Sequence, residues 1–266
     1  MKPVLYHHGM SVCAAKVRMA LAEKGVDWDG QYIDIRAGQQ RTPEYLALNP
    51  KGVVPTLVHS DDVIVESTVI CEYIDDAFDG PGLIPDSATA RARMRQWAKR
   101  IDDGLHFPAT AALTFAIAGR PGLPKAVVRR VPGMKMAVDA EPPADGALGN
   151  LVEATGISTT TLVAALRAFD KALADMETSL TGVAWLAGDA FSLADISYAP
   201  YLTRLDCLQL QWLWDERPAV ADWYQRVRAR PSYAPSITDC FDPPGEIEAM
   251  ETNGREVGPV LRGMLA

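Results

Sequence analysis

The sequence predicts an α/β domain followed by an all-helical domain. Over residues 1–80, short apolar runs typical of strands alternate with segments whose apolar residues recur every three or four positions, as in helices. The Gly/Pro-rich segment DGPGLIPD (79–86) then interrupts this alternation. Beyond it, strand patterns disappear and long helical patterns follow. We therefore expect domains at 1–80 and 87–266.

The first elements are a strand, a helix and a second strand. PVLYHH (3–8) and WDGQYIDI (28–35) are strand-like. Between them, Val12, Ala15 and Met19 have helical spacing in a segment that ends near Gly25. This arrangement favours a helix lying against the two strands.

A short helix, a hairpin and a longer helix follow. TPEYLALNP (42–50) carries one proline in its first turn and another at its end, which is typical of a short helix. TLVHS and VIV flank Asp61–Asp62 as the strands of a hairpin. ESTVICEYIDDAF (66–78) returns to helical spacing. Such an order is that of a small α/β domain with a mixed sheet.

The second domain is predicted to contain helices joined partly by a long insertion. The insertion near 119–157 is rich in Gly, Pro and charge, and two readings remain open: a solvated loop, or a lid or pocket wall. Helical patterns cover 87–107, 158–180, 192–208 and 219–230.

Composition restricts the function classes. Lys+Arg 26 against Asp+Glu 34 gives a net charge of −8, which argues against binding nucleic acid or anionic membranes. The first ten residues contain no apolar stretch of signal-peptide length, and no run approaches the roughly 20 apolar residues of a membrane span. Four widely spaced cysteines do not predict a zinc site. We expect a cytoplasmic protein with free thiols and without a metal.

VVPTL (53–57) places a proline where a strand begins. A proline there lacks a donor for the strand ladder and is confined to an edge or a first position. Two alternatives follow from the residues: a trans proline that starts the strand, or a cis bond before Pro55 that turns the backbone of Val54 toward a ligand. An extended peptide is the ligand such a backbone would pair with.

ESTVI (66–70) stands where a strand meets a helix. Ser67 is placed to cap this helix or to bind an anion, and Glu66 is placed to pair with an ammonium. FSLADISYAP (191–200) has the spacing of a capping box, with Ser192 at the cap and Asp195 three residues later. We interpret the second motif as structural.

Together these motifs resemble the glutathione transferase family over nearly the whole chain up to about Arg230. The resemblance implies a thioredoxin-like domain that binds glutathione and a helical domain that supplies most of an electrophile pocket. It also implies a cis Pro55, Val54 as the residue that holds the cysteinyl backbone of glutathione, and Glu66 with Ser67 for its γ-glutamyl group. A homodimer in the cytoplasm is a further implication.

Shorter motifs resemble particular branches of that family. SVCAAKVRMALAEKG (11–25) looks like the zeta-class motif, and MSVCAAK (10–16) is similar to tetrachlorohydroquinone reductive dehalogenases. VIVESTVICEYIDDAF (63–78) and RRVPGMKM (129–136) look like bacterial β-aryl etherases. Two positions depart from these patterns: Val53 stands where many relatives carry glutamine, and Ala14 stands where the dehalogenases carry serine.

Three residues are candidates for activating the thiol of glutathione. Ser11 lies just before the first helix, where its hydroxyl and the helix N-terminus can both stabilise a thiolate; alternatively it only caps the helix. Cys13 shares this N-terminus and is placed to form a mixed disulfide, or is a small packed residue. Tyr6, near the end of the first strand, is the third candidate, or packs in the sheet.

Other residues are candidates for the two ends of the substrate site. Lys51, and more weakly Gln40, are placed to meet the glycine carboxylate of glutathione. The pocket for the electrophile is expected between the domains, so its candidate residues come from the loop before the first helix and from the second domain. These candidates are Met10, His106, Phe107 and Phe115. Each of these four residues is alternatively part of the hydrophobic core. Adjacent His7 and His8 have no third ligand at clear spacing, so they do not predict a metal site.

The predicted function is that of a glutathione transferase acting on an apolar or aromatic electrophile. For the etherase-like branch, the leaving group is a phenolate from a β-aryl ether. Reductive dehalogenation or cis–trans isomerisation at Ser11 and Cys13 are alternative chemistries. A non-catalytic module of the same fold that binds partners or apolar ligands is the alternative of a different class.

Overall fold

Four short strands form one mixed sheet near the start of the chain. The computed structural model describes residues 1–118, 146–243 and 245–265. The strand order is β2-β1-β3-β4; β1 pairs in parallel with β2 and antiparallel with β3, and β3 and β4 form the predicted hairpin. The strands are β1 (Val4–His7), β2 (Asp29–Tyr32), β3 (Thr56–His59) and β4 (Asp62–Val65).

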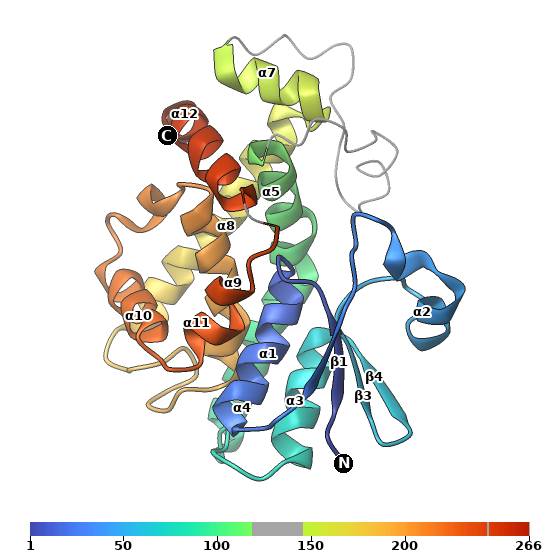
Figure 1. The fold of residues 1–266 in the computed structure, drawn as a ribbon. Helices are drawn as coiled ribbons and strands as arrows, with labels where there is room; N and C mark the ends of the chain where they lie inside the picture. Colours follow the sequence, from blue (N-terminus) through green and yellow to red (C-terminus); the bar gives the residue numbers. More distant parts are fainter. Residues whose placement is uncertain (119–145, 244, 266) are drawn as a thin grey trace. The chain divides into compact units, whose positions relative to one another are not determined.

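Helices α1 (Val12–Lys24) and α3 (Ser67–Ala77) pack against each other and lie on the same side of this sheet (Figure 1). The short α2 (Pro43–Leu48), preceded by the 3₁₀ helix η1 (Gln39–Arg41), lies on the other side. The core between the sheet, α1 and α3 consists of fully buried aliphatic side chains, among them Leu5, Val17, Leu21, Leu57, Ile70 and Ile74. The predicted α/β order is confirmed.

Helices make up the rest of the described chain, as predicted. The α-helices are α4 (Ala88–Arg100), α5 (Ala111–Ile117), α7 (Gly146–Thr155), α8 (Thr159–Leu180), α9 (Leu193–Cys207), α10 (Pro218–Arg228), α11 (Tyr233–Ser236) and α12 (Glu246–Leu265). The other helical segments are the π-helical η2 (Ile101–Thr110) and the 3₁₀ helices η3 (Gln211–Trp214) and η4 (Thr238–Cys240). Most of the predicted insertion, including RRVPGMKM, lies outside the described residues.

The chain forms two compact units. The first comprises Met1–Ala98, Ala184–Pro200 and Gln225–Asp242, and the second comprises Lys99–Val183, Tyr201–Tyr224 and Pro243–Ala266. The unit that contains the sheet thus extends beyond residue 80. The predicted division into folding domains at 1–80 and 87–266 stays a prediction.

The helix predicted over 87–107 is two elements. After α4 the backbone continues as the π-helical segment η2, inside which Phe107 is extended (φ −122°, ψ 129°) and precedes a cis Pro108. The residue before a proline is disfavoured in the helical region, and proline has no N–H to donate. Phe107 and Pro108 therefore interrupt the helix, and α5 begins only at Ala111.

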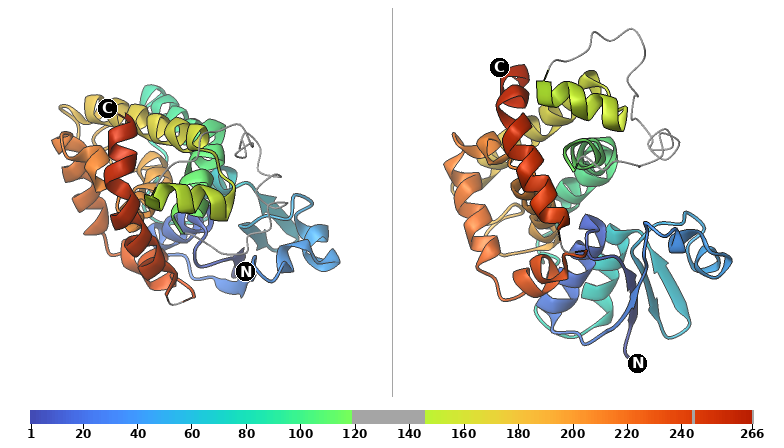
Figure 2. Two further views of the ribbon diagram at one scale, coloured as in Figure 1. Left: turned by 90° about the horizontal axis from the view of Figure 1, so that it is seen from above. Right: turned by 45° about the horizontal axis from the view of Figure 1, so that its top comes forward.

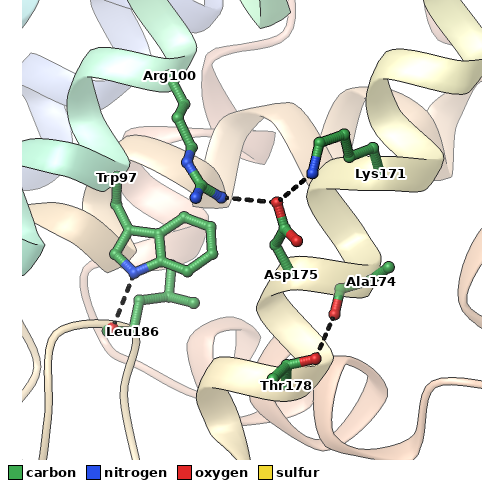
Figure 3. A network of polar contacts seen from close by, with 7 residues as sticks. All are labelled: Trp97, Arg100, Lys171, Ala174, Asp175, Thr178 and Leu186. Atoms are coloured by element: carbon green, nitrogen blue, oxygen red, sulfur yellow. Dashed lines mark hydrogen bonds and ion pairs between the residues drawn. The ribbon is translucent and has the colours of Figure 1, made fainter.

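Helices α5, α8 and α12 pack against one another in the second unit, where the views of Figure 2 show α12 alongside α8. Gly254 of α12 allows a close approach, because a Cβ there would lie 2.2 Å from the carbonyl oxygen of Leu208. On the surface of the same unit, Asp175 of α8 accepts hydrogen bonds from Arg100 and Lys171 at 3.0 and 3.1 Å (Figure 3). This ion-pair network borders a groove of about 650 Å³ between η2 and α8.

Candidate functional site

Ser11 is the N-cap of α1. Its backbone is extended (φ −76°, ψ 115°), and its Oγ accepts a hydrogen bond from the N–H of Ala14 at 3.2 Å. The hydroxyl is half-buried, and within the described part of the chain no acceptor is recorded for its proton. Since the free N–H groups of a helix N-terminus favour negative charge, the Ser11 hydroxyl and α1 together form a place suited to an anionic sulfur.

The loop that delivers Ser11 is fixed by His8 and Arg18. The Nδ1 of His8 accepts the N–H of Met10 at 3.1 Å, and its carbonyl accepts the N–H of Ser11 at 3.1 Å. Arg18, buried in α1, donates to the carbonyls of His8 and Gly9 at 3.3 and 3.1 Å, and to that of Ser236 at 2.7 Å. The position of Ser11 therefore depends on this hydrogen-bonded loop.

His7, the last residue of β1, and His8 of this loop are both neutral at pH 7. Burial, followed by the charges of Arg18 and His8, lowers the pKa of His7 to about 4. Burial, followed by the charge of Arg36, lowers the pKa of His8 to about 4 as well. The hydrogen bonds agree with neutral rings, because the Nδ1 of each histidine is an acceptor. His8 Nδ1 accepts from the N–H of Met10, and His7 Nδ1 accepts from Arg18.

Acid is expected to destabilise this loop through His8. Its pKa in the folded chain lies below the ordinary 6.5, so the unfolded chain binds the proton more readily. The contribution of neutral His8 to the free energy of unfolding is complete above pH 6.5 and is lost as the pH falls toward 4. For this buried side chain the contribution amounts to up to about 3 kcal/mol. The variant His8→Asn, whose Oδ1 keeps an acceptor for the Met10 N–H, should reduce the dependence of the urea midpoint on pH between 6.5 and 4 and leave the part that His7 contributes.

The same titration of the wild-type protein serves as the control. If the midpoint of His8→Asn falls with acid as steeply as that of the wild type, then the protonation of His8 is not what weakens the fold.

Cys13 and Tyr6 lie near Ser11 in the sequence but in different settings. Cys13 is a half-buried cysteine in the first turn of α1 and belongs to no disulfide. Tyr6, on β1, is half-buried and contacts the ring of Tyr45 edge-on, with 5.9 Å between ring centroids. Tyr6 thus packs against α2, whereas Cys13 shares the helix N-terminus with Ser11.

The Val54–Pro55 peptide bond is cis, which confirms the alternative implied by the resemblance. The preceding carbonyl, of Val53, accepts hydrogen bonds from Tyr45 Oη at 2.7 Å and Asn49 Nδ2 at 2.9 Å, both from buried side chains. No hydrogen bond recorded within the described chain uses the backbone of Val54. The N–H and carbonyl of Val54 are therefore available to an extended peptide.

Glu66 and Ser67 mark the start of α3. Glu66 has φ 71°, and its exposed carboxylate forms an ion pair with Lys51 at 2.5 Å, which raises the pKa of Lys51. Ser67 is the first residue of α3 and is buried, and its Oγ accepts a hydrogen bond from Lys16 Nζ at 3.2 Å. The fold thus brings Lys51 and Glu66 together.

Gln40 lies in η1, next to the loop that carries Lys51. Its Nε2 donates to the carbonyl of Ile35 at 3.0 Å. A Cβ at Gly52 would lie 2.9 Å from the carbonyl oxygen of Gln40, so Gly52 (φ 61°) allows the two loops to touch. Gln40 therefore lies beside the residue that follows Lys51, and a shared role for Gln40 and Lys51 at one end of a ligand stays a prediction.

The residues proposed for the second pocket are divided between the two units. Met10 is buried in the first unit. In the second, His106 Nδ1 lies 3.2 Å from Tyr201 Oη and its ring lies 4.2 Å from that of Phe107, centroid to centroid. Phe107 is exposed, and Phe115 is half-buried on α5. A shared role for these four residues stays a prediction.

Sequence reasoning missed three buried cations of α1, Lys16, Arg18 and Lys24, of which the first two lie next to the candidate site. Lys16 and Arg18 are almost fully buried, although a charged residue in a helical pattern normally indicates a solvated face. Their positions within the apolar run VCAAKVRMALAEK were the available signal. Both reach polar atoms next to the candidate site.

Two absences apply to the described chain. Within 1–118, 146–243 and 245–265, no cluster of three or more His, Cys, Asp and Glu residues is arranged to hold a metal ion. In the same ranges, none of the helices combines the length and the apolar character that crossing a bilayer requires.

Comparisons with known proteins give a consistent result. The family model "Glutathione S-transferase, N-terminal domain" matches residues 10–77, and "Glutathione S-transferase, C-terminal domain" matches residues 129–226. A tetrachloro-p-hydroquinone reductive dehalogenase from Sphingobium chlorophenolicum is 30% identical over 236 residues, which cover 86% of this chain and 93% of the relative.

Two further similarities concern a plant protein and a solved structure. Glutathione S-transferase TCHQD of Arabidopsis thaliana is 27% identical over 255 residues, covering 90% of each chain. The crystal structure of the beta-etherase LigF from Sphingobium sp. strain SYK-6 superposes with a TM-score of 0.67 at 26% identity, covering 90% of this chain and 100% of that one.

Proposed function

The chain belongs to the glutathione transferase superfamily, and we propose that it activates the thiol of glutathione with Ser11 and transfers the sulfur to an aromatic electrophile. The thiol of glutathione has a pKa near 8.5, so only a few per cent is thiolate at pH 7. Lowering this pKa by about two units requires roughly 2.7 kcal/mol. The observation that supports the proposal most directly is the Ser11 hydroxyl at the N-terminus of α1.

Glutathione binds along the edge that Val54 and the start of α3 share. The Val54 backbone pairs with the cysteinyl residue, and Glu66 with Ser67 receives the γ-glutamyl group. Lys51, assisted by Gln40, meets the glycine carboxylate. Because Lys51 and Glu66 are both exposed, exchanging their mutual ion pair for these new partners costs little.

The reaction is a displacement at carbon. The thiolate forms a carbon–sulfur bond while the bond to the leaving group breaks, and the leaving group departs with the electron pair. For a β-aryl ether this leaving group is a phenolate, which then takes a proton from water. The similarity to the beta-etherase LigF supports aryl ethers as the substrate class. The rate enhancement comes from holding the two reactants in position and from converting the thiol to the thiolate.

Reductive dehalogenation is the second candidate, supported by Cys13 in the first turn of α1 and by the 30% identical dehalogenase. In this chemistry the sulfur of glutathione first displaces halide from the substrate. The Cys13 thiolate then attacks that sulfur, the substrate carbon departs with the electron pair and takes up a proton, and Cys13 becomes a mixed disulfide with glutathione. Treatment with glutathione disulfide followed by mass spectrometry tests it: a glutathione adduct on Cys13 supports the second candidate, and an unmodified Cys13 removes it.

The proposed function predicts both binding and turnover. The protein should be retained on immobilised glutathione, release heat when titrated with the tripeptide, and conjugate glutathione to chlorodinitrobenzene. With a panel of β-aryl ethers it should release the corresponding phenol only when glutathione is present. Heat-inactivated protein is the control.

Retention without turnover of any electrophile would instead favour a binding module of the same fold. Absence of both heat and retention would exclude glutathione as the ligand. The mass of the protein in solution, measured by light scattering, tests the homodimer that we propose from the family resemblance.

A further inference from the structure

A buried lysine contacts the residues that begin α3. Lys16, on α1, has no exposed surface, and its Nζ donates to Ser67 Oγ at 3.2 Å and to Thr68 Oγ1 at 2.9 Å. Ser67 and Thr68 are the first two residues of α3, and Ser67 is itself buried. An ammonium carries three donors and no acceptor, so both hydroxyls act as acceptors toward Lys16.

This contact fixes the direction in which the Ser67 hydroxyl donates. A hydroxyl has one proton and two lone pairs. Since Lys16 occupies a lone pair of Ser67 Oγ, the proton of Ser67 is directed away from Lys16 and is available to an acceptor at the start of α3. A negatively charged oxygen is the acceptor that gains most from such a donor.

The charges at the start of α3 favour the same kind of ligand. The N-terminus of an 11-residue helix carries partial positive charge, and Lys16 places a full positive charge directly behind it. The carboxylate of the neighbouring Glu66 is exposed and paired with Lys51. Because Lys16 is screened from water, its charge acts on a bound group more strongly than a surface lysine would.

We propose that Lys16 is a positioning residue that holds Ser67 as a donor to the α-carboxylate of the γ-glutamyl group. It thereby selects tripeptides that carry this carboxylate. This inference rests on the proposed function, since it concerns the same glutathione site. Lys16 acts through Ser67 and takes no part in the transfer of sulfur.

The decisive comparison uses two thiols, glutathione and its decarboxylated analogue 4-aminobutyryl-cysteinylglycine. Wild-type protein should show a lower KM for glutathione than for the analogue. In Lys16→Met, the KM for glutathione should rise about fivefold, whereas the KM for the analogue and both kcat values stay within about twofold of wild type. The preference for the carboxylate is thus reduced without a change in turnover.

Two other variants separate charge from packing. Lys16→Gln keeps an amide donor for Ser67 but removes the charge, so it should lose a smaller part of the preference than Lys16→Met. It also provides a folded variant if methionine is not tolerated. Thr68→Val removes the hydroxyl that accepts from Lys16 at 2.9 Å and leaves the Ser67 contact, so it should keep the wild-type preference. Thermal melting of the ligand-free variants reports any purely structural effect.

The possible outcomes distinguish the role of Lys16 from the proposed function as a whole. Equal rises in KM for both thiols, or a wild-type KM for glutathione in folded Lys16→Met or Lys16→Gln, would overturn the role of Lys16 and leave the proposed function intact. A wild-type protein that binds neither thiol would overturn the proposed function itself.

Discussion

Replacing Asp195 by alanine is expected to lower the free energy of unfolding by about 3–4 kcal/mol. The carboxylate of Asp195 is fully buried at the start of α9. Its Oδ1 accepts the N–H of Leu186 at 3.0 Å, and its Oδ2 accepts the N–H of Ser192 at 3.0 Å and the hydroxyl of Ser192 at 3.2 Å. Alanine removes all three bonds from a place that water does not reach.

The size of the effect follows from the donors that lose this partner. A buried N–H deprived of its acceptor costs about 1–3 kcal/mol, and Asp195 serves two of them. The loss of negative charge in the first turn of α9 adds a smaller term. Ser192, whose Oγ accepts the N–H of Ala194 at 3.3 Å, completes the predicted capping box, which is confirmed.

Urea denaturation at equal protein concentration measures this prediction. Asp195→Asn preserves the volume but replaces one acceptor oxygen with a donor, so it should be destabilised by a similar amount. An exposed acidic residue on a helix, such as Glu256→Ala on α12, is the control and should change stability by less than about 0.5 kcal/mol. A midpoint for Asp195→Ala close to that of the wild type would contradict the assignment of Asp195 as the main acceptor here.

Ser11→Ala is expected to lower kcat by at least about tenfold while glutathione still binds. The alanine variant keeps the N-terminus of α1 but loses the hydroxyl that donates to the sulfur. The thiol of bound glutathione should then titrate at higher pH, closer to 8.5. Measured with chlorodinitrobenzene, the pH–rate profile should shift upward, and calorimetry should give a similar Kd for glutathione.

A second N-cap separates catalysis from capping. Ser158 caps α8 as Ser11 caps α1, with its Oγ accepting the N–H of Thr161 at 3.1 Å. Ser158→Ala and Ser11→Ala should each lose about 1 kcal/mol of stability, but only Ser11→Ala should lose turnover. Cys13→Ala should retain turnover within about twofold. Full activity of Ser11→Ala would remove Ser11 from the mechanism and leave it as a helix cap.

Local patterns in the sequence were sufficient to predict most of the fold. The alternation of strand and helix spacing, the Asp61–Asp62 hairpin and the proline at the start of α2 are features that depend on neighbouring residues alone. The caps at Ser11 and at Ser192 are local for the same reason, because a cap satisfies an N–H two or three residues away.

The helix predicted over 87–107 shows where a local pattern fails. Its apolar spacing continues up to Phe107, but the backbone leaves the α-helical path after Arg100 and becomes extended at Phe107. Pro108 was the available signal, since the residue before a proline avoids the helical region. A continuous apolar pattern thus indicates which face is buried and does not exclude a break within it.

The sequence by itself determined the order of strands and helices, the caps and the family motifs around Ser11, Pro55 and Glu66. Only the tertiary structure decided that Lys16 donates to Ser67, that Arg18 reaches Ser236, and that Tyr45 with Asn49 holds the carbonyl of Val53. The physical reason is that a charged side chain in a helical pattern is compatible with either water or burial. Which of the two it meets depends on packing with residues such as Ser67 and Ser236, 51 and 218 positions away.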